Sequence, residues 1–319
     1  MVERALISVF DKTGLDAFAR GLADLGVEIV ASGGTAAYVA ELGIDVVPVE
    51  EITDTPEMLG GRVKTLHPGI HGGILARRDD EGDLDDLRDQ GIRPFDLVCV
   101  NLYPFQHVAG QRNVREEEAV EMIDIGGPAM LRAAAKNFLH VIPVCRAERY
   151  DELLQRLAGG GVDLDMRRRL AAEAFAHTAA YEASIATWFA DVETFPPRLI
   201  VSLERAAELA YGENPHQRAA YYAERGARRH LLSRTEQLHG RQMSFNNLYD
   251  LDAGLGLLPL TCRVKASGAA VPPLSFTTCL MTISFAPRSL LVTVQVLLWP
   301  AATVTLPELS QSPLNPVKL

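Results

Sequence analysis

The chain has 319 residues, about twice the usual length of one domain, and this length predicts two domains. Hydrophobic residues make up 48% and charged residues 23%, an ordinary globular composition that excludes disorder of the whole chain. The formal net charge of -10 disfavours proteins that work mainly on nucleic acid or on an anionic membrane, because both partners require a basic surface.

The four cysteines are far apart in the sequence. Cys99, Cys145, Cys262 and Cys279 form no C-x-x-C pair, so the sequence predicts neither a structural zinc site nor a disulfide scaffold. Residues 1–4 lead directly into a strand-like segment, without the long apolar stretch of a signal peptide or membrane anchor. We therefore expect a cytoplasmic protein with reduced thiols.

Short apolar runs alternate with amphipathic stretches over the first 145 residues, a pattern typical of an α/β domain. Between the first two runs, apolar residues recur at steps of three and four over 15–25, and Gly26 follows as a helix stop. The strands are predicted at 5–10, 27–31, 45–49, 96–102 and 140–144. The pattern predicts a parallel sheet flanked by helices, with binding groups at the carboxyl ends of the strands.

Helical patterns dominate the next segment. Helices are predicted at 150–157 and 166–189, and Pro196-Pro197 then ends the segment as a domain boundary. A further segment begins near Ile200 and contains AYGENPHQ and SFNNLYDLDAG.

The composition changes near Pro259. Residues 259–319 contain only five charged residues in 61, eight of the 18 prolines and no Asp. Within this tail, residues 289–299 fit either a strand or an aggregation-prone segment, and they are too short to span a bilayer as a helix. The tail resembles a translated wrong reading frame, and a genuine lineage-specific ending is the alternative.

Two loops are candidate phosphate sites. Ser32-Gly33-Gly34-Thr35 follows a strand and opens a helix, where backbone N–H groups can bind a phosphate; a plain turn and helix cap is the alternative. Asp11-Lys12-Thr13-Gly14 occupies the same position after the first strand, and a solvated lysine in a turn is its alternative.

Residues 62–68 form a basic loop between glycine pairs. Arg62 and Lys64 are two residues apart, so both can face one pocket in an extended segment. His67 and His71 suggest a metal site, but no carboxylate or cysteine lies nearby at metal-ligand spacing. The sequence therefore predicts no metal.

Further polar residues are predicted at the ends of neighbouring strands. Asn101 and Tyr103 follow the fourth strand, and Asp124 precedes a helix predicted at 129–137 whose last turn contains Lys136. Alternatively, Tyr103 fills the core, Asp124 closes a turn and Lys136 faces the negative end of the helix. Taken with the phosphate loops, these residues have the composition of a metal-free site for proton transfer.

Residues 4–258 resemble the bifunctional purine-biosynthesis family that combines IMP cyclohydrolase with AICAR transformylase. The motifs SVFDKTGL, SGGTA, GGRVKTLHPGIHGGIL, NLYPF, IDIGGPAMLRAAAKN and YGENPHQ match that family in order. The resemblance implies a methylglyoxal-synthase-like cyclohydrolase domain at 1–145, a helical extension and linker at 146–197, a fragment of the transformylase domain at 198–258 and the aberrant tail at 259–319.

The resemblance also implies the roles of individual residues toward a small phosphorylated purine precursor. Catalysis is assigned to Lys64, Tyr103, Asp124 and Lys136. Substrate binding is assigned to Lys12, Thr13, Ser32, Gly33, Gly34, Thr35, Arg62, Thr65, Asn101, Gly126 and Gly127. No metal or cofactor is implied for ring closure. Phe10 stands where some relatives have a polar residue, so no side-chain hydrogen bond is expected there.

The transformylase half is incomplete in this sequence. The Lys-His-x-Asn-Pro-Cys-Gly motif on which that half depends is absent, and Ala210 replaces the family's usual Arg. We therefore expect formyl transfer from the co-substrate 10-formyltetrahydrofolate to be lost. The family is homodimeric, and the sequence leaves open whether the shortened chain dimerises. A methylglyoxal-synthase-type lyase and a non-catalytic nucleotide-binding module remain alternatives, although the KTLHP and NLYPF loops favour the cyclohydrolase.

Overall fold

The computed structural model describes residues 2–55, 58–111, 113–190, 195, 197–224, 232, 237, 240–261, 278–284 and 291–297. Side chains are described up to Leu255, with the exception of Glu224, and only the backbone beyond. The chain divides into two units, Met1–Ser202 and Leu203–Leu319, which are considered separately. Most of the predicted aberrant tail at 259–319 lies outside the described residues.

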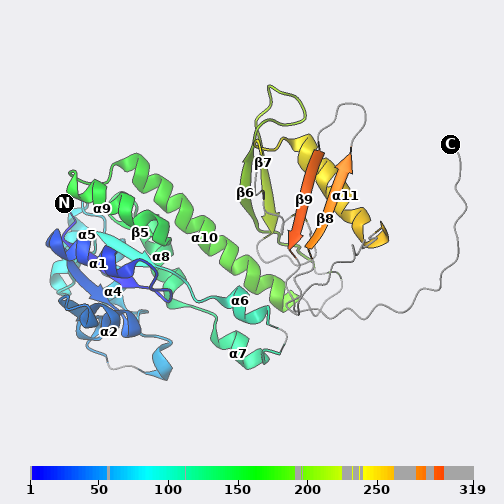
Figure 1. Ribbon diagram of the computed structural model, residues 1–319. Helices are drawn as coiled ribbons and strands as arrows, with labels where there is room; N and C mark the ends of the chain where they lie inside the picture. Colours follow the sequence, from blue (N-terminus) through cyan, green and yellow to red (C-terminus); the bar gives the residue numbers. More distant parts are fainter. Residues whose placement is uncertain are drawn as a thin grey trace, which may run out of the picture. The chain divides into compact units, whose positions relative to one another are not determined.

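A five-stranded parallel sheet forms the centre of the first unit, in the order β3-β2-β1-β4-β5 (Figure 1). Leu6 of the central strand pairs with Val30 on one side and Val98 on the other. The strands are β1 Arg4–Ser8, β2 Glu28–Ala31, β3 Val46–Pro48, β4 Leu97–Val100 and β5 Ile142–Val144. The predicted parallel sheet is confirmed, and each strand is one to three residues shorter than predicted.

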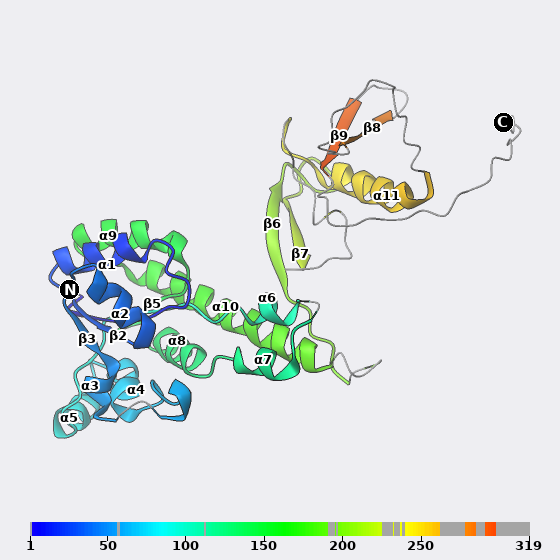
Figure 2. The same ribbon diagram turned by 60° about the horizontal axis from the view of Figure 1, so that its bottom comes forward.

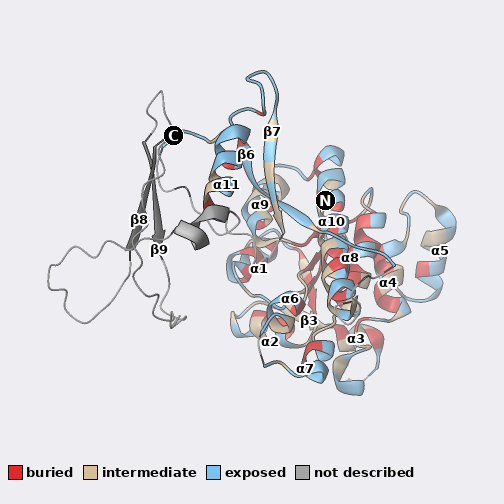
Figure 3. Ribbon diagram, turned by 90° about the vertical axis from the view of Figure 1, so that its right-hand side faces the viewer, coloured by how far each residue is buried: buried red, intermediate tan, exposed pale blue. Residues whose placement is uncertain are grey.

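Helices cover both faces of this sheet. They are α1 Leu15–Asp24, α2 Gly33–Glu41, α3 Val49–Thr53, α4 Pro68–Leu75, α5 Glu81–Asp89, α6 Phe105–Ala109, α7 Glu116–Glu121, α8 Gly126–Lys136, α9 Tyr150–Ala158 and α10 Leu164–Ala190. Successive side chains of β1 point to opposite faces of the sheet. Ile7 therefore lies in a core with α1, α2 and α9, and Leu6 lies in a second core with α3, α4 and α8. Figure 3 shows the buried residues on the strands and on the inner sides of these helices.

Helix α8 begins earlier than predicted. The predicted start at Ala129 relied on Pro128 as the first helical residue, but the helix starts at Gly126. The Asp124 carboxylate accepts the N–H of Gly127 at 2.9 Å and so satisfies a free donor of the first turn. The carboxylate is thereby held at the positive end of α8.

Two short helices between β4 and α8 lie beside the later turns of α10 (Figures 1 and 2). The ring of Phe105, the first residue of α6, meets that of Trp188 edge to face, with centroids 5.7 Å apart. Helix α10 therefore supports the loops on either side of α6 and α7.

The second unit has two antiparallel strand pairs and one long helix in its described part. β6 Leu203–Leu209 pairs with β7 Ala219–Glu224, β8 Thr278–Ser284 pairs with β9 Leu291–Leu297, and α11 covers Phe245–Thr261. β9 falls within residues 289–299, for which a strand was one of the two expectations. Among the described residues, no helix is both long and apolar enough to cross a membrane.

Candidate functional site

Hydroxyl and ammonium groups gather where β1 ends and α2 begins. The Thr35 hydroxyl donates to the carbonyl of Val9 at 3.0 Å and accepts from the Val9 N–H at 3.1 Å. The Lys12 ammonium donates to the same carbonyl and lies 3.4 Å from the Thr35 hydroxyl. A 2.7 Å hydrogen bond joins the hydroxyl of Ser32 to that of Ser8. Three of the residues predicted to hold a phosphate are thus brought together at the carboxyl edge of the sheet.

The side chain of Asn101 holds the loop after β1. Its Oδ1 accepts the N–H groups of Phe10 and Asp11 at 2.6 and 3.1 Å, and its Nδ2 donates to the carbonyl of Asp11 at 2.8 Å. The Thr13 hydroxyl donates to the Asp11 carboxylate at 2.7 Å, and this bond lowers the pKa of Asp11. Asn101 and Thr13 were predicted as substrate ligands; in the structure their side chains shape the loop that presents Lys12.

The Lys64 ammonium lies over the N-terminus of α2. Its Nζ is 2.7 Å from Oε1 of Glu50, and the two side chains are 14% and 30% exposed. Burial acts to raise the pKa of Glu50, but the hydrogen bond and charge of Lys64 bring it below its ordinary value. A Cβ added at Gly33 would lie 2.8 Å from Nζ, and φ there is +41°, a left-handed backbone conformation that favours glycine.

This end of α2 is an electropositive position. Ser32 precedes the helix with extended backbone and makes no side-chain capping hydrogen bond, so the first N–H groups of α2 have no cap from it. The helix dipole adds to the positive charge of Lys64 at this point. The arrangement suits an anion such as a phosphate.

The N-terminus of α8 packs closely against two polar side chains of the candidate site. A Cβ added at Gly126 would lie 2.3 Å from Oγ1 of Thr65. A Cβ added at Gly127 would lie 2.3 Å from Oδ2 of Asp124. These glycines allow the basic loop and the Asp124 turn to approach α8, so the two loops share one edge of the domain.

Tyr103 lies close enough to Asp124 for the charge of the carboxyl group to affect the pKa of the phenol. Burial raises the pKa of Asp124, and the hydrogen bond from the Gly127 N–H opposes this rise. Burial and then the charge of Asp124 raise the pKa of Tyr103, whereas Lys64 lowers it. Tyr103 is 43% exposed and therefore reachable by a bound molecule. Tyr103, Asp124 and Lys64 thus bring a phenol, a carboxyl group and an ammonium into one region of the domain. Proton transfer requires titratable groups placed in this way.

Of the remaining predicted residues, Arg62 pairs with a carboxylate whose charge acts on Tyr103, and Lys136 lies apart from this group. Arg62 is exposed and forms a bidentate pair with Glu121 of α7, at 2.9 and 3.1 Å. Lys136 is exposed in the last turn of α8, and ten residues of helix separate it from Gly126 by about 15 Å. Lys136 therefore does not reach Asp124 within this chain, because the two residues lie at opposite ends of α8.

Sequence reasoning missed three residues at this site. Glu50 pairs with Lys64, Glu121 pairs with Arg62, and the Tyr181 hydroxyl contacts the backbone of Asp124. Glu50 and Glu121 belong to acidic runs that suggest only a solvated surface, and Tyr181 lies in an alanine-rich helix. No local pattern identifies these contacts, since each joins segments distant in the sequence.

The two histidines of the basic loop take other roles. His67 caps α4, its Nδ1 accepting the N–H of Gly69 at 3.0 Å. Burial lowers the pKa of His71. In the part of the chain that the structure describes, no three or more His, Cys, Asp or Glu side chains are arranged to hold a metal ion.

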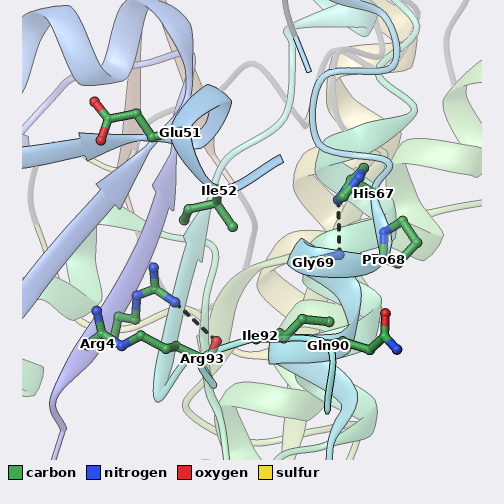
Figure 4. Close-up of a pocket in the computed structure, with 10 residues that line it drawn as sticks. Arg4, Glu51, Ile52, His67, Pro68, Gly69, Gln90, Ile92 and Arg93 are labelled. Carbon is green, nitrogen blue, oxygen red and sulfur yellow. Dashed lines mark hydrogen bonds between the residues drawn. The ribbon is translucent and has the colours of Figure 1, made fainter. Parts of the chain in front are cut away.

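A hollow of about 300 Å³ lies elsewhere on the first unit, beside the first residue of β1 (Figure 4). Arg4 and Arg93 line it, together with Ile52 of α3 and His67 at the start of α4. The Arg4 guanidinium donates to the carbonyl of Arg93 at 3.1 Å and pairs with Glu28. None of the residues assigned to substrate or catalysis lines this hollow.

Comparisons with known proteins agree with the fold. Residues 14–129 match a family described as the MGS-like domain, and residues 134–268 match the family described as AICARFT/IMPCHase bienzyme. The crystal structure of ForH covers 59% of this chain and is itself covered completely, with 39% identity and a TM-score of 0.54. The predicted methylglyoxal-synthase-like fold is confirmed for the first unit.

Curated relatives match this chain over a longer span than the ForH structure does. The bifunctional purine biosynthesis protein PurH of Listeria monocytogenes serotype 4b (strain F2365) is 50% identical over 257 residues, which are 80% of this chain and 50% of that protein. PurH of Leuconostoc mesenteroides subsp. mesenteroides is 47% identical over 255 residues, with the same shares of 80% and 50%. The chain spans about half the length of the curated relatives it matches.

Proposed function

The chain belongs to the AICARFT/IMPCHase bienzyme family, and from this premise we propose that its first unit closes formyl-AICAR to IMP with loss of water. The observation that carries the proposal is the position of Lys64, whose ammonium lies over the N-terminus of α2 and acts on the titration of Tyr103. A phosphate site and a proton-transfer group are thereby adjacent.

The phosphate of the substrate is proposed to bind at the N-terminus of α2. Ser32, Gly33, Gly34 and Thr35 supply hydroxyl and backbone N–H groups there, and Lys12 supplies positive charge. A phosphate held in this way fixes one end of a flexible molecule. The reacting groups at the other end then meet in a restricted set of orientations, which removes much of the entropic barrier to ring closure.

Ring closure needs charge stabilisation and two proton movements. The carboxamide nitrogen attacks the formyl carbon, and negative charge develops on the formyl oxygen, where the Lys64 ammonium stabilises it. One proton passes from the attacking nitrogen to this oxygen. The C–O bond then breaks with a second proton, from the formamide nitrogen, so that water leaves and the C=N bond forms. Tyr103 and Asp124 are the proposed carriers of these protons.

No added metal or cofactor is proposed for this reaction, and its place is the cytoplasm. The 319-residue chain lacks the Lys-His-x-Asn-Pro-Cys-Gly motif, so formyl transfer from 10-formyltetrahydrofolate to AICAR is not expected of it. Homodimer formation by this chain is left open.

Incubation of the purified chain with formyl-AICAR, followed by chromatography, tests the proposal. Formation of IMP above the uncatalysed rate supports it. Conversion of dihydroxyacetone phosphate to methylglyoxal supports the lyase alternative instead. Binding of a purine nucleotide without turnover of either compound supports the non-catalytic alternative.

A further inference from the structure

The hydroxyl of Tyr181 joins two backbone groups of the turn that carries Asp124. It accepts the N–H of Asp124 at 2.7 Å and donates to the carbonyl of Met122 at 3.0 Å. Tyr181 belongs to α10 and is 57 residues from Asp124 in the sequence. The contact is therefore a tertiary one that the turn cannot make for itself.

The phenol has the protonation state that this double contact needs. Burial raises the pKa of Tyr181 to about 12, so the hydroxyl keeps its proton at neutral pH and can donate to Met122. The Tyr181 ring also packs edge to face on Phe105, with centroids 6.4 Å apart. Phe105 is fully buried and comes two residues after Tyr103. One side chain of α10 thus contacts both loops that supply proton-transfer groups.

The Asp124 carboxyl group is held from the other side by α8. Its Oδ1 accepts the N–H of Gly127 at 2.9 Å. The backbone of Asp124 is fixed by Tyr181 and its side chain by Gly127, so neither contact alone sets the position of the carboxyl group. Removal of one of them leaves the turn free to move toward solvent.

We propose that Tyr181 is a positioning residue for ring closure, which fixes Asp124 relative to Tyr103 without touching the substrate. This inference rests on the proposed cyclohydrolase function. The contacts of Tyr181 described above are with the Asp124 turn and Phe105 rather than with the proposed phosphate site on α2, so its loss should affect the chemical step and leave substrate binding nearly intact.

Tyr181→Phe tests the inference in the full chain, because it removes both hydrogen bonds and keeps the ring on Phe105. We expect kcat for IMP formation to fall at least tenfold, while KM changes less than twofold. The matched control is Ser184→Ala, since the Ser184 hydroxyl donates to the carbonyl of Ala180 within α10, at 2.9 Å. This variant should retain both kinetic constants.

A pH measurement separates positioning from a general loss of stability. Once the turn is free, water reaches Asp124 and the effect of burial on its pKa diminishes. The acid limb of the pH–rate profile should therefore move to lower pH in Tyr181→Phe and stay unchanged in Ser184→Ala. NMR titration of ¹³C-labelled aspartate carboxyl groups, with Asp124→Asn as the assignment control, should show the same shift whether or not the chain turns over.

The two proposals fail in different ways. If the parent chain forms no IMP, the proposed cyclohydrolase function is wrong. The NMR titration then still shows whether Tyr181 positions the Asp124 carboxyl group. If the parent chain is active and Tyr181→Phe keeps its kcat and its Asp124 titration, Tyr181 is not a positioning residue.

Discussion

The ammonium of Lys64 lies 2.7 Å from the carboxylate of Glu50, directly over Gly33 at the start of α2. This pair places a carboxylate next to the position proposed for the substrate phosphate. A phosphate bound there is repelled by the negative charge of Glu50. Glu50 therefore limits the affinity of the site.

Glu50→Gln is expected to lower KM for formyl-AICAR about fivefold, since two unit charges 4 Å apart in water interact by about 1 kcal/mol. Glu51→Gln, on the same short helix and exposed, is the matched control and should leave KM unchanged. Steady-state kinetics of both variants measure the difference. A KM for Glu50→Gln equal to or above that of the parent would show that Glu50 does not compete with the substrate.

Asp124→Asn is expected to abolish turnover and to raise Tm at neutral pH. Burial raises the pKa of Asp124, so the folded chain keeps this proton to a higher pH than the unfolded chain. Ionised Asp124 therefore lowers the stability of the folded state, and the penalty develops as pH rises from the unfolded pKa, about 3.9, through the folded pKa. The Asn Oδ1 can still accept the Gly127 N–H.

Thermal unfolding of the parent and of Asp124→Asn, at neutral pH and at about pH 3, tests whether ionised Asp124 lowers the stability of the folded chain. In acid, Asp124 of the parent is protonated in both the folded and the unfolded chain, since the unfolded pKa is about 3.9. The difference in Tm should shrink in acid. A lower Tm for Asp124→Asn at neutral pH contradicts the account of burial.

Gly127→Ala is expected to destabilise the first unit by about 1–3 kcal/mol, the usual effect of overpacking. The added Cβ would lie 2.3 Å from the Asp124 carboxylate and 3.1 Å from Leu102. At Gly34 nothing lies within 4 Å of an added Cβ, so Gly34→Ala should leave stability nearly unchanged. Denaturant titration compares the two, and equal stabilities would mean that the close approach at Gly127 is relieved without effect.

Residues 1–202 are expected to fold alone and to keep the activity of the full chain, because every candidate site residue lies in that unit. In the second unit, the described residues form one core cluster of only four buried side chains, Leu209, Leu232, Leu248 and Leu255. So small a core gives little stability. Soluble yield should therefore rise when the chain is cut after Ser202. Loss of IMP formation on cutting would show that the second unit contributes to the site.

The sequence predicts the sheet well because four of its five strands, β1, β2, β4 and β5, are largely buried and consist of nearly continuous apolar runs. Helices α1, α9 and α10 are also found within two residues of their predicted ends. The short helices α3 to α7 were not predicted. Periodicity is weak over five to nine residues, and tertiary contacts such as that of Phe105 with Trp188 fix such elements.

The site was predicted less completely than the sheet. Residues that follow strands directly, such as Lys12 and Ser32, are brought together because parallel strands end at one edge. Glu50, Glu121 and Tyr181 were missed since their contacts depend on how distant segments pack. Lys136 and Asp124, both assigned to catalysis, lie far apart within one chain because Asp124 precedes α8 and Lys136 is in its last turn. The role of Lys136 stays a prediction.

The central claim is that Lys64 stabilises charge that develops during ring closure. The decisive measurement is the steady-state kinetics of IMP formation from formyl-AICAR by the parent chain and by Lys64→Met, in the presence of a chelator. Lys64→Met keeps an unbranched side chain, one heavy atom shorter, and removes its charge. We predict that the parent is active, that kcat of Lys64→Met is about 100-fold lower, and that KM rises by a much smaller factor, as expected for an interaction made mainly in the transition state. An inactive parent, or a Lys64→Met variant with unchanged kcat, would contradict the account.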